Sequence, residues 1–273
     1  TVSLKDDLTE TLYEAKGLTE ASYTMENPYS NTHYFWQVTA NTPNGKVKSG
    51  IYDFYSADYK RTLNIPSVSN TRDIGGFSSS VGGMKQGLVY RSGRLDDINE
   101  EGKEVLRQLD IQTDLDIRSK GEGTVNPAQL PNYYNKTLLS YFQDFDEKNR
   151  AQTVEAVRVF TNPDNYPVIF HCAVGRDRTG TLAVLLNLLC GIDLDDILLD
   201  YSMYVFTKIC NDTPLNTMLS NYYSLINYLT YYIGKDNVDE GTIYDRTEEY
   251  CKDIGVSSNE IASIRNILLE ENK

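Results

Sequence analysis

The chain has 273 residues, of which 40% are hydrophobic, and this is enough for one large domain or for one domain and a smaller module. Its formal net charge of -13 and isoelectric point near 4.6 argue against a nucleic-acid-binding protein, because such proteins need a basic surface. A phosphate-bearing ligand remains compatible with this charge, since surface charge is screened over about 8 Å whereas groups in a site act at contact.

The first sixty residues carry the pattern of β-hairpins. Residues 31–40 and 50–54 are runs rich in aromatic and β-branched residues, and Asn44-Gly45 between them is a tight-turn signal. This order resembles the second half of a fibronectin type III module, in which an Asn-Thr-x-Tyr-x-Trp-x-Val strand precedes a turn and an edge strand. We expect a small β-sandwich-like piece without the module's first strands. It either packs on the rest of the chain as a structural appendage or pairs with strands outside this sequence.

Short apolar runs then alternate with amphipathic segments, which is the order of an α/β domain. Strands are predicted over residues 88–90, 114–117, 134–139 and 167–170, and helices over residues 99–109 and 148–160. Ligands of open α/β sheets bind at the carboxyl ends of the strands. The segment that follows residue 170 is therefore the candidate site.

Residues 171–180 read His-Cys-Ala-Val-Gly-Arg-Asp-Arg-Thr-Gly, and a largely apolar helix is predicted over residues 179–190. A loop that leads into a helix directs several backbone amides into one small space, where the helix dipole also favours an anion. The same field should lower the pKa of Cys172 below its ordinary value of about 8.5. The segment is thus predicted to be a phosphate-cleaving loop.

Each polar side chain of this loop has a predicted role. Cys172 is the candidate nucleophile, Arg178 offers a planar fork for two phosphoryl oxygens, and Thr179 can hydrogen-bond the thiolate or help it to leave. His171 is expected to brace the loop through its ring nitrogens. The other residues of the predicted phosphate-binding set are Ala173, Val174, Gly175, Arg176 and Gly180.

These residues resemble the Cys-(five residues)-Arg-Thr signature of the cysteine-dependent protein tyrosine phosphatases. The longer pattern His-Cys-x-x-Gly-x-Asp-Arg-Thr-Gly is similar to that of a bacterial group that includes secreted mycobacterial and listerial enzymes, some of which also act on phosphoinositides. Residues 70–76, 88–93 and 116–122 resemble further motifs of this group, so that the resemblance is strong over residues 63–191. Arg176 stands where several members carry Lys, and a lysine-based preference for lipid headgroups is therefore not carried over.

The resemblance implies a fold of the α/β class, with a cysteine-phosphatase-like sheet flanked by helices over residues 59–273, after the β-sandwich-like piece over residues 1–58. It implies a phosphomonoesterase that hydrolyses phosphotyrosine through a cysteinyl-phosphate intermediate and needs no cofactor. A dual-specificity or phosphoinositide phosphatase is one alternative, because pocket depth decides the substrate, and an inactive phosphate-binding or adhesion module is another. The expected partner is a phosphorylated protein or a small phosphomonoester. A secreted or cell-surface location is favoured over a cytoplasmic one.

Two residues compete for the role of the acid that protonates the leaving oxygen. Asp177 lies where the resembling group carries an Asp, although the arginines on either side should keep it ionised. Asp144 lies 28 residues before Cys172, as the mobile-loop acid does in ordinary tyrosine phosphatases, and Asp146 has the same claim. We favour Asp177 and leave Asp144 open.

Arg72 and Asp73 are predicted either to lie at the rim of the site and position the substrate, or to form a structural ion pair. Arg118 is expected to be a supporting residue held by Asp or Glu partners.

The four cysteines form no Cys-x-x-Cys pair and the chain has only two histidines, so no metal site is predicted. No membrane-length apolar run is present, and the start at Thr1 instead of Met suggests a processed or trimmed product.

The C-terminal third is predicted to be helical. Between residues 215 and 233, apolar and aromatic residues recur at spacings of three and four. This Tyr-rich helix is expected to pack on the core and not to serve as a binding platform.

Overall fold

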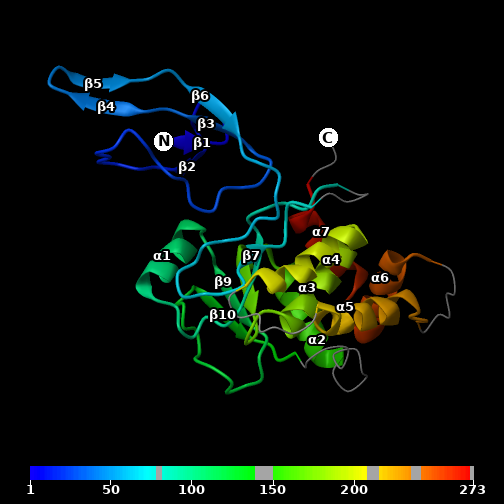
Figure 1. Cartoon of the computed structure of the whole chain (residues 1–273). Helices are drawn as coiled ribbons and strands as arrows, with labels where there is room; N and C mark the ends of the chain where they lie inside the picture. Colours follow the sequence, from blue (N-terminus) through cyan, green and yellow to red (C-terminus); the bar gives the residue numbers. More distant parts are fainter. Residues whose placement is uncertain (78–81, 139–149, 208–214, 235–240, 271–273) are drawn as a thin grey trace. The chain divides into compact units, whose positions relative to one another are not determined.

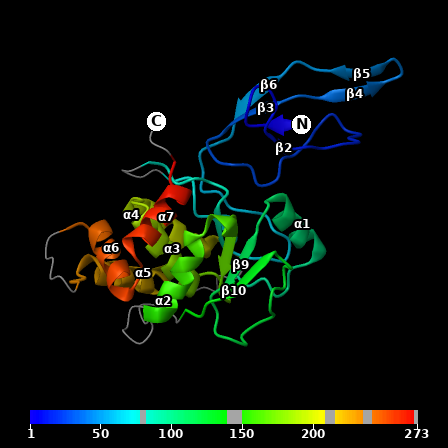
Figure 2. The same cartoon turned by 180° about the vertical axis from the view of Figure 1, so that it is seen from behind.

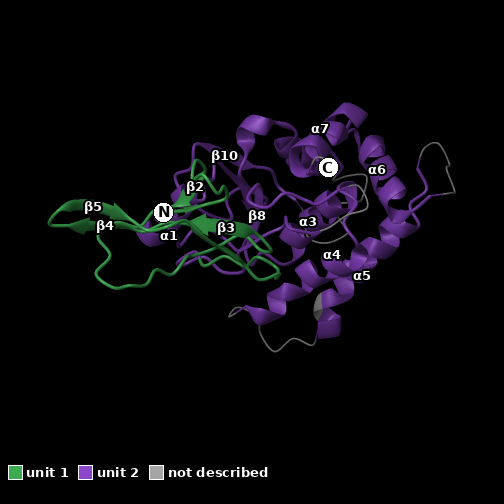
Figure 3. Cartoon of the chain, turned by 90° about the horizontal axis from the view of Figure 1, so that it is seen from above, with its two compact units in different colours: residues 1–64 green, residues 65–273 purple. Residues whose placement is uncertain are grey.

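The computed structural model describes residues 1–77, 82–138, 150–207, 215–234 and 241–270. It divides the chain into two compact units, residues 1–64 and residues 65–273 (Figure 3). The division falls six residues after the boundary that the sequence predicts between residues 58 and 59.

Side chains just after residue 58 explain this difference. The Tyr59 hydroxyl and the Arg61 Nε both donate to the Pro28 carbonyl oxygen at 3.0 Å. The Arg61 guanidinium also lies 4.3 Å from the centre of the Tyr29 ring and is almost wholly buried. These contacts make residues 59–61 part of the first unit.

The first unit is built on a four-stranded antiparallel sheet in the order β2-β1-β3-β6. Its strands are β1 (Val2–Ser3), β2 (Thr11–Tyr13), β3 (His33–Trp36) and β6 (Tyr52–Tyr55). Aromatic rings stack across β3 and β6, with Tyr34 on Phe54 and Trp36 on Tyr52 at centroid distances of 5.3 and 5.1 Å. Such cross-strand pairs stabilise a sheet that has little other core.

A separate hairpin joins β4 (Thr39–Thr42) to β5 (Gly45–Lys48), and all of its residues are exposed. Thr42 pairs with Gly45, so that Pro43 and Asn44 are the two residues of the turn. The turn signal in the sequence is thus shifted by one residue, and Gly45 opens the second strand with a positive φ of 113°.

The second unit contains a five-stranded sheet in the order β10-β9-β11-β8-β7. Its strands are β7 (Arg72–Asp73), β8 (Val89–Ser92), β9 (Thr113–Asp116), β10 (Asn132–Asn135) and β11 (Val168–His171). Only β7 is antiparallel to its neighbour. His171 lies opposite both Ser92 and Asp116, so the carboxyl ends of the three central strands open onto one edge.

Helix α1 lies on one side of this sheet and the other helices lie on the opposite side, in both views (Figures 1 and 2). The helices are α1 (Glu100–Gln108), α2 (Arg150–Arg158), α3 (Asp177–Leu189), α4 (Leu194–Ser202), α5 (Leu215–Thr230), α6 (Ile243–Ile254) and α7 (Ser258–Leu268). Short 3-10 helices follow α2 and α4, over Val159–Thr161, Pro163–Asn165 and Met203–Phe206. The second unit is therefore an α/β fold, as expected, with both faces of its sheet covered by helices.

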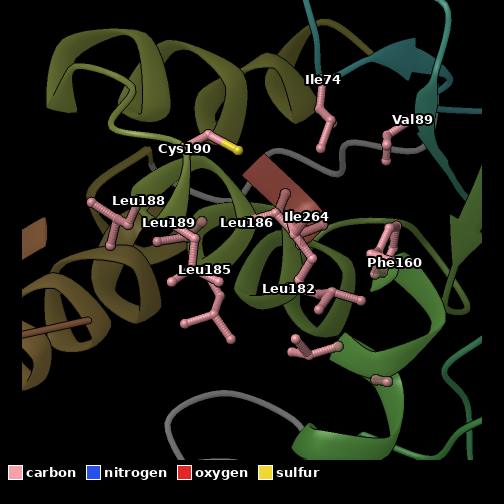
Figure 4. Close-up of a cluster of buried hydrophobic side chains, with 14 of the residues drawn as sticks. Ile74, Val89, Phe160, Leu182, Leu185, Leu186, Leu188, Leu189, Cys190 and Ile264 are labelled. Atoms are coloured by element: carbon pink, nitrogen blue, oxygen red, sulfur yellow. The ribbon is translucent and has the colours of Figure 1, made fainter. Parts of the chain in front are cut away.

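Helix α3 runs through the centre of the core. Every residue from Thr179 to Leu189 is buried, and Leu182, Leu186 and Ile264 of α7 meet beside Phe160 (Figure 4). A helix that is apolar all round must be enclosed by other elements. This fixes the start of α3, and the loop before it, against the end of β11.

The observed bounds differ from the sequence-based ones by a few residues. Strand β10 begins at Asn132 and not at residue 134, and residues 139 and 148–149 at the ends of two predicted elements lie outside the described residues. The predicted helix over residues 148–160 is split, because α2 ends at Arg158 and tightens into a 3-10 turn.

Candidate active site

The loop from residue 172 to residue 176 joins β11 to α3 at the carboxyl edge of the sheet. The N-cap residue of α3, Arg176, makes no side-chain capping hydrogen bond, in contrast to those of α6 and α7, each of which forms a capping box. The first amides of a helix need hydrogen-bond partners from outside the helix. The start of α3 is thus suited to bind an anion.

Cys172 is the first residue of this loop, and only 2% of its surface is exposed. Burial raises the pKa of its thiol, but the nearby hydroxyl and amide of Thr179, the charge of Arg178 and the amide of Gly175 together lower it below the ordinary value. Cys190 and Cys251 are equally buried without such partners, and burial raises the pKa of each thiol to about 12. Of these three thiols, only that of Cys172 has a lowered pKa.

The turn of the loop depends on Gly175. Its φ is +69°, and a Cβ atom at this position would lie 2.3 Å from the carbonyl oxygen of Ser92. The carbonyl of Gly175 accepts hydrogen bonds from Asn70 Nδ2 and Arg91 Nη2, both at 2.9 Å. Asn70 Nδ2 also donates to the carbonyl of Val174 at 2.9 Å. The loop carbonyls are therefore held by side chains of other elements.

Arg178 is held at the other end of the loop by Glu122. Its Nη1 donates to both carboxylate oxygens, at 3.2 and 3.0 Å, and its side chain is 14% exposed. Burial raises the pKa of Glu122, but Arg178 brings it below its ordinary value. The pair keeps the guanidinium beside the loop, where its fork can hold two oxygens of one phosphoryl group.

His171 is fully buried behind the loop. Its Nδ1 lies 3.2 Å from the carbonyl oxygen of Cys172, and its Nε2 lies 3.0 Å from Asp114 Oδ1. Burial lowers the pKa of the imidazole, but the carboxylates of Asp114 and Asp116 and the Cys172 carbonyl together raise it above the ordinary value. The imidazole thus lies between the loop, which its Nδ1 contacts, and the carboxylate of Asp114 on β9, as expected of a bracing residue.

Asp177 is the first residue of α3 and contacts two other side chains. Arg176 donates hydrogen bonds from Nε and Nη2 to its carboxylate at 2.9–3.0 Å, and Asn221 Nδ2 of α5 donates to its Oδ1 at 3.2 Å. The carboxylate thus lies at the start of α3, held between the last residue of the loop and α5. The competing Asp144 and Asp146 lie outside the described residues.

Arg72 and Asp73 do not lie at the rim of the site. Arg72 is 1% exposed and donates from Nε to Asp200 Oδ1 at 2.9 Å. Asp73 is fully buried and accepts hydrogen bonds from the amides of Gly75 and Gly87, at 2.8 and 2.6 Å. The expected contact of these side chains with substrate is therefore replaced by structural contacts, an ion pair of Arg72 with Asp200 and backbone hydrogen bonds to Asp73.

Gly180 also has a packing role in place of the expected substrate contact. It is buried, and a Cβ atom on it would lie 2.4 Å from the Tyr201 ring of α4. Ala173 and Val174, in contrast, are exposed on the loop.

Arg118 is held by carboxylates as expected, since its Nε and Nη2 donate to Asp116 at 2.9 and 2.8 Å and its Nη1 donates to Asp96 at 2.6 Å.

The model of the tyrosine phosphatase family matches residues 63–270, which is most of the chain. The chain belongs to this family. The match excludes residues 1–62, which make up nearly all of the first unit.

Two curated relatives of this phosphatase are bacterial proteins. It is 27% identical over 176 residues to a "putative tyrosine-protein phosphatase" of Cupriavidus necator, covering 54% of this chain and 64% of the relative. It is 22% identical over 187 residues to the triple specificity protein phosphatase PtpB of Mycobacterium tuberculosis, covering 50% of this chain and 67% of the relative. The phosphatase thus spans about two thirds of the length of these relatives.

Solved structures of the catalytic core of Siw14 are also similar. One, the PP-IP phosphatase from S. cerevisiae in complex with citrate, has 20% identity and a TM-score of 0.35, covering 52% of this chain and 83% of that one. Another has 19% identity and a TM-score of 0.36, covering 60% of this chain and 96% of that one.

Several residues that support the phosphatase site had no assigned role in the sequence. The sequence places Asn70 in the motif of residues 70–76 and Glu122 at the end of the motif of residues 116–122, and the charge of Glu122 is a usable signal for an arginine partner. Asp114, Asp200 and Asn221 gave no signal in the sequence, because each comes near the site only through the tertiary fold.

The described residues contain no group of three or more His, Cys, Asp or Glu that could hold a metal, and none of their helices is long and apolar enough to cross a membrane.

Proposed function

We propose that this phosphatase hydrolyses phosphotyrosine through a cysteinyl-phosphate intermediate. The observation that carries the proposal is the lowered pKa of the Cys172 thiol at the start of the loop that leads into α3, whose N-cap side chain makes no capping hydrogen bond. Arg178, held by Glu122, supplies the charge that the phosphoryl oxygens need. No cofactor is required, because the loop itself provides the nucleophile and the electrostatic stabilisation.

In the first step, the Cys172 thiolate attacks phosphorus, so that an S–P bond forms as the P–O bond to the leaving oxygen breaks. Arg178 and the loop amides hold the equatorial oxygens of the transferring group. Asp177 gives its proton to the leaving oxygen, and Thr179 stabilises the sulfur by its hydroxyl. In the second step, water attacks phosphorus and gives a proton to Asp177, the S–P bond breaks, and inorganic phosphate leaves with the thiolate restored.

The test is an assay with a generic aryl phosphate, with and without vanadate, which mimics the five-coordinate phosphorus. Release of phosphate that vanadate blocks supports the proposal. A folded protein that releases no phosphate would instead favour the inactive phosphate-binding or adhesion module.

Phosphotyrosine is separated from the alternative substrates in a second assay. Peptides carrying phosphotyrosine, phosphoserine or phosphothreonine and vesicles containing a phosphoinositide are compared by kcat/KM. A preference for phosphotyrosine supports the proposal, whereas equal rates support a dual-specificity or phosphoinositide phosphatase. The relative named as a triple specificity phosphatase is the reason to include these substrates.

For residues 1–58 we propose a partial fibronectin type III-like module that serves as a structural appendage. Its antiparallel sheet and exposed hairpin are consistent with such a module. A bacterial source and a secreted or cell-surface location are proposed on the resemblance to secreted bacterial enzymes. Fractionation of the source cells, with the protein found only in the cytoplasm, would contradict the location.

A further inference from the structure

The carbonyl groups of the phosphate loop are bound on one side by two donors. Asn70 Nδ2 holds the carbonyls of Val174 and Gly175, and Arg91 Nη2 holds those of Gly175 and Arg176, at 2.9 and 3.4 Å. In a planar peptide unit the N–H and C=O groups point in opposite directions. Donors that hold consecutive carbonyls on one side therefore turn the amides toward the opposite side, where an anion can bind them.

Both donors are oriented by one carboxylate, that of Asp200 on α4. Its Oδ2 accepts from Arg91 Nη1, and its Oδ1 accepts from Arg72 Nε at 2.9 Å. Arg72 Nη2 also donates to the backbone carbonyl of Asp200 at 2.9 Å. Arg72 Nη1 in turn donates to Asn70 Oδ1, which leaves the Nδ2 of that amide directed at the loop.

The three charged side chains are buried together, since Arg72, Arg91 and Asp200 are each no more than 2% exposed. Burial and the charge of Arg91 lower the pKa of Arg72 to about 10, against the opposing effect of Asp200, so the guanidinium remains charged at neutral pH. Two like charges side by side in the interior repel each other and need an anion between them. Asp200 is therefore required for both arginines to keep these positions.

We infer that Asp200 is a positioning residue of the phosphate loop. It directs Arg91 and, through Arg72, Asn70 at the carbonyls of residues 174–176, so that the loop amides face the Cys172 thiolate and the bound phosphoryl group. The inference rests on the proposed function, because it assigns a role within the same site. Asp200 itself lies behind the loop and takes no part in the chemical step.

The first test is the Asp200→Asn variant, which keeps the shape of the side chain but removes its charge. Three quantities are compared with the wild type: kcat/KM on an aryl phosphate, inhibition by vanadate, and the pH midpoint of Cys172 alkylation by iodoacetamide. Since a misplacement of about 1 Å can cost about 10²-fold in rate, we expect kcat/KM to fall by about that factor. The alkylation midpoint should rise by about one pH unit, and vanadate should bind at least about tenfold more weakly, because the amides no longer face the sulfur.

A matched control separates positioning from general stability. Ile264→Ala removes a buried apolar side chain of α7 that packs beside Leu182 and Leu186 of α3 (Figure 4). It should lower the melting temperature while leaving the alkylation midpoint of the folded protein unchanged. If Asp200→Asn behaves in the same way, with only its melting temperature reduced, the inference is overturned.

A second variant covers the case in which Asp200→Asn does not fold. The double variant Asn70→Asp with Asp200→Asn keeps two arginines and one carboxylate in the cluster, so its buried charge is unchanged. Asp is tolerated at the positive φ of residue 70, but its carboxylate cannot donate to the carbonyls of Val174 and Gly175. A folded double variant with a raised alkylation midpoint and weak vanadate binding supports positioning. Wild-type values for both would show that Asp200 only balances charge.

The outcomes also distinguish this inference from the proposed function. A wild-type protein that cleaves no aryl phosphate refutes the function, whatever the variants do. An active wild type whose Asp200→Asn variant keeps its thiolate reactivity and vanadate affinity refutes only the inference.

Discussion

The substitution Gly175→Ala adds a single methyl group at the turn of the phosphate loop. The alanine would have to adopt a φ of +69°, which costs a residue with a side chain about 1–2 kcal/mol. Its Cβ would also lie 2.3 Å from the Ser92 carbonyl oxygen and 2.7 Å from the Gly93 amide nitrogen, whereas real Cβ atoms essentially never approach closer than 3.0 Å. Both neighbours are backbone atoms of the strand end and cannot swing aside, so the loop must move.

The displacement needed to relieve this contact is about 0.7 Å or more. Since a misplacement of about 1 Å can cost about 10²-fold in rate, we expect kcat/KM on an aryl phosphate to fall by about 10²-fold. The free energy of unfolding should fall by about 1–3 kcal/mol through backbone strain and overpacking. Both are measured on the same preparation, by steady-state kinetics and by denaturant unfolding.

Gly17→Ala is the matched control. Gly17 has the same φ of +69°, but nothing lies within 4 Å of the Cβ that alanine would bring. It should therefore show the strain of the backbone without the clash, and its kcat/KM should remain that of the wild type. The reasoning is refuted if Gly175→Ala keeps kcat/KM within about threefold of the wild type, because the loop would then tolerate the movement.

Four further predictions concern the loop side chains. Cys172→Ser should abolish turnover yet still bind vanadate, as measured by calorimetry, because the amides survive the loss of the nucleophile; turnover near that of the wild type would contradict this. Arg178→Lys should lower kcat by several orders of magnitude, since a point charge cannot replace the planar fork, and a loss below about tenfold would count against the bidentate role. Asp177→Asn should cost about 10²-fold or more with an alkyl-like leaving group but much less with an activated one, and equal losses would remove it as the acid. Because the pKa of Cys172 is lowered, the rate of its alkylation by iodoacetamide should reach half its maximum at a pH below the ordinary thiol pKa of about 8.5. Cys190 and Cys251, with pKa values of about 12, should stay unmodified in the folded protein. Modification of all three thiols at one rate would contradict these pKa shifts.

The phosphate loop could be predicted from sequence because its parts are adjacent in the chain. Cys172, Gly175 and Arg178 fall within one strand-loop-helix unit, so their spacing alone brings them together, and the structure places that unit as expected. The α/β class followed in the same way from the alternation of apolar runs. The order of the strands could not be predicted, because the place of β11 between β8 and β9 depends on contacts between distant segments.

The supporting residues show the limit of local reasoning. Arg72 and Asp73 are charged, as residues at the rim of a site often are, yet both are buried. Arg72 binds Asp200, and Asp73 binds the amides of Gly75 and Gly87. Asp200 lies on α4 behind Asp195 and Asp196, and nothing in its sequence position distinguishes a buried carboxylate from an exposed one. Only the tertiary contacts of α4 show that Asp200 is the one of these three carboxylates that meets the buried arginines Arg72 and Arg91.

Helix α3 has a consequence for how this protein responds to heat. The helix is enclosed on all sides by the core, and its first turn carries Asp177, Arg178 and Thr179 of the site. Loosening the core therefore displaces these side chains at the same time, and the loop cannot melt separately while α3 stays in place. Activity and tertiary structure should be lost in a single cooperative transition, so that a thermal inactivation curve reports directly on global unfolding of the second unit.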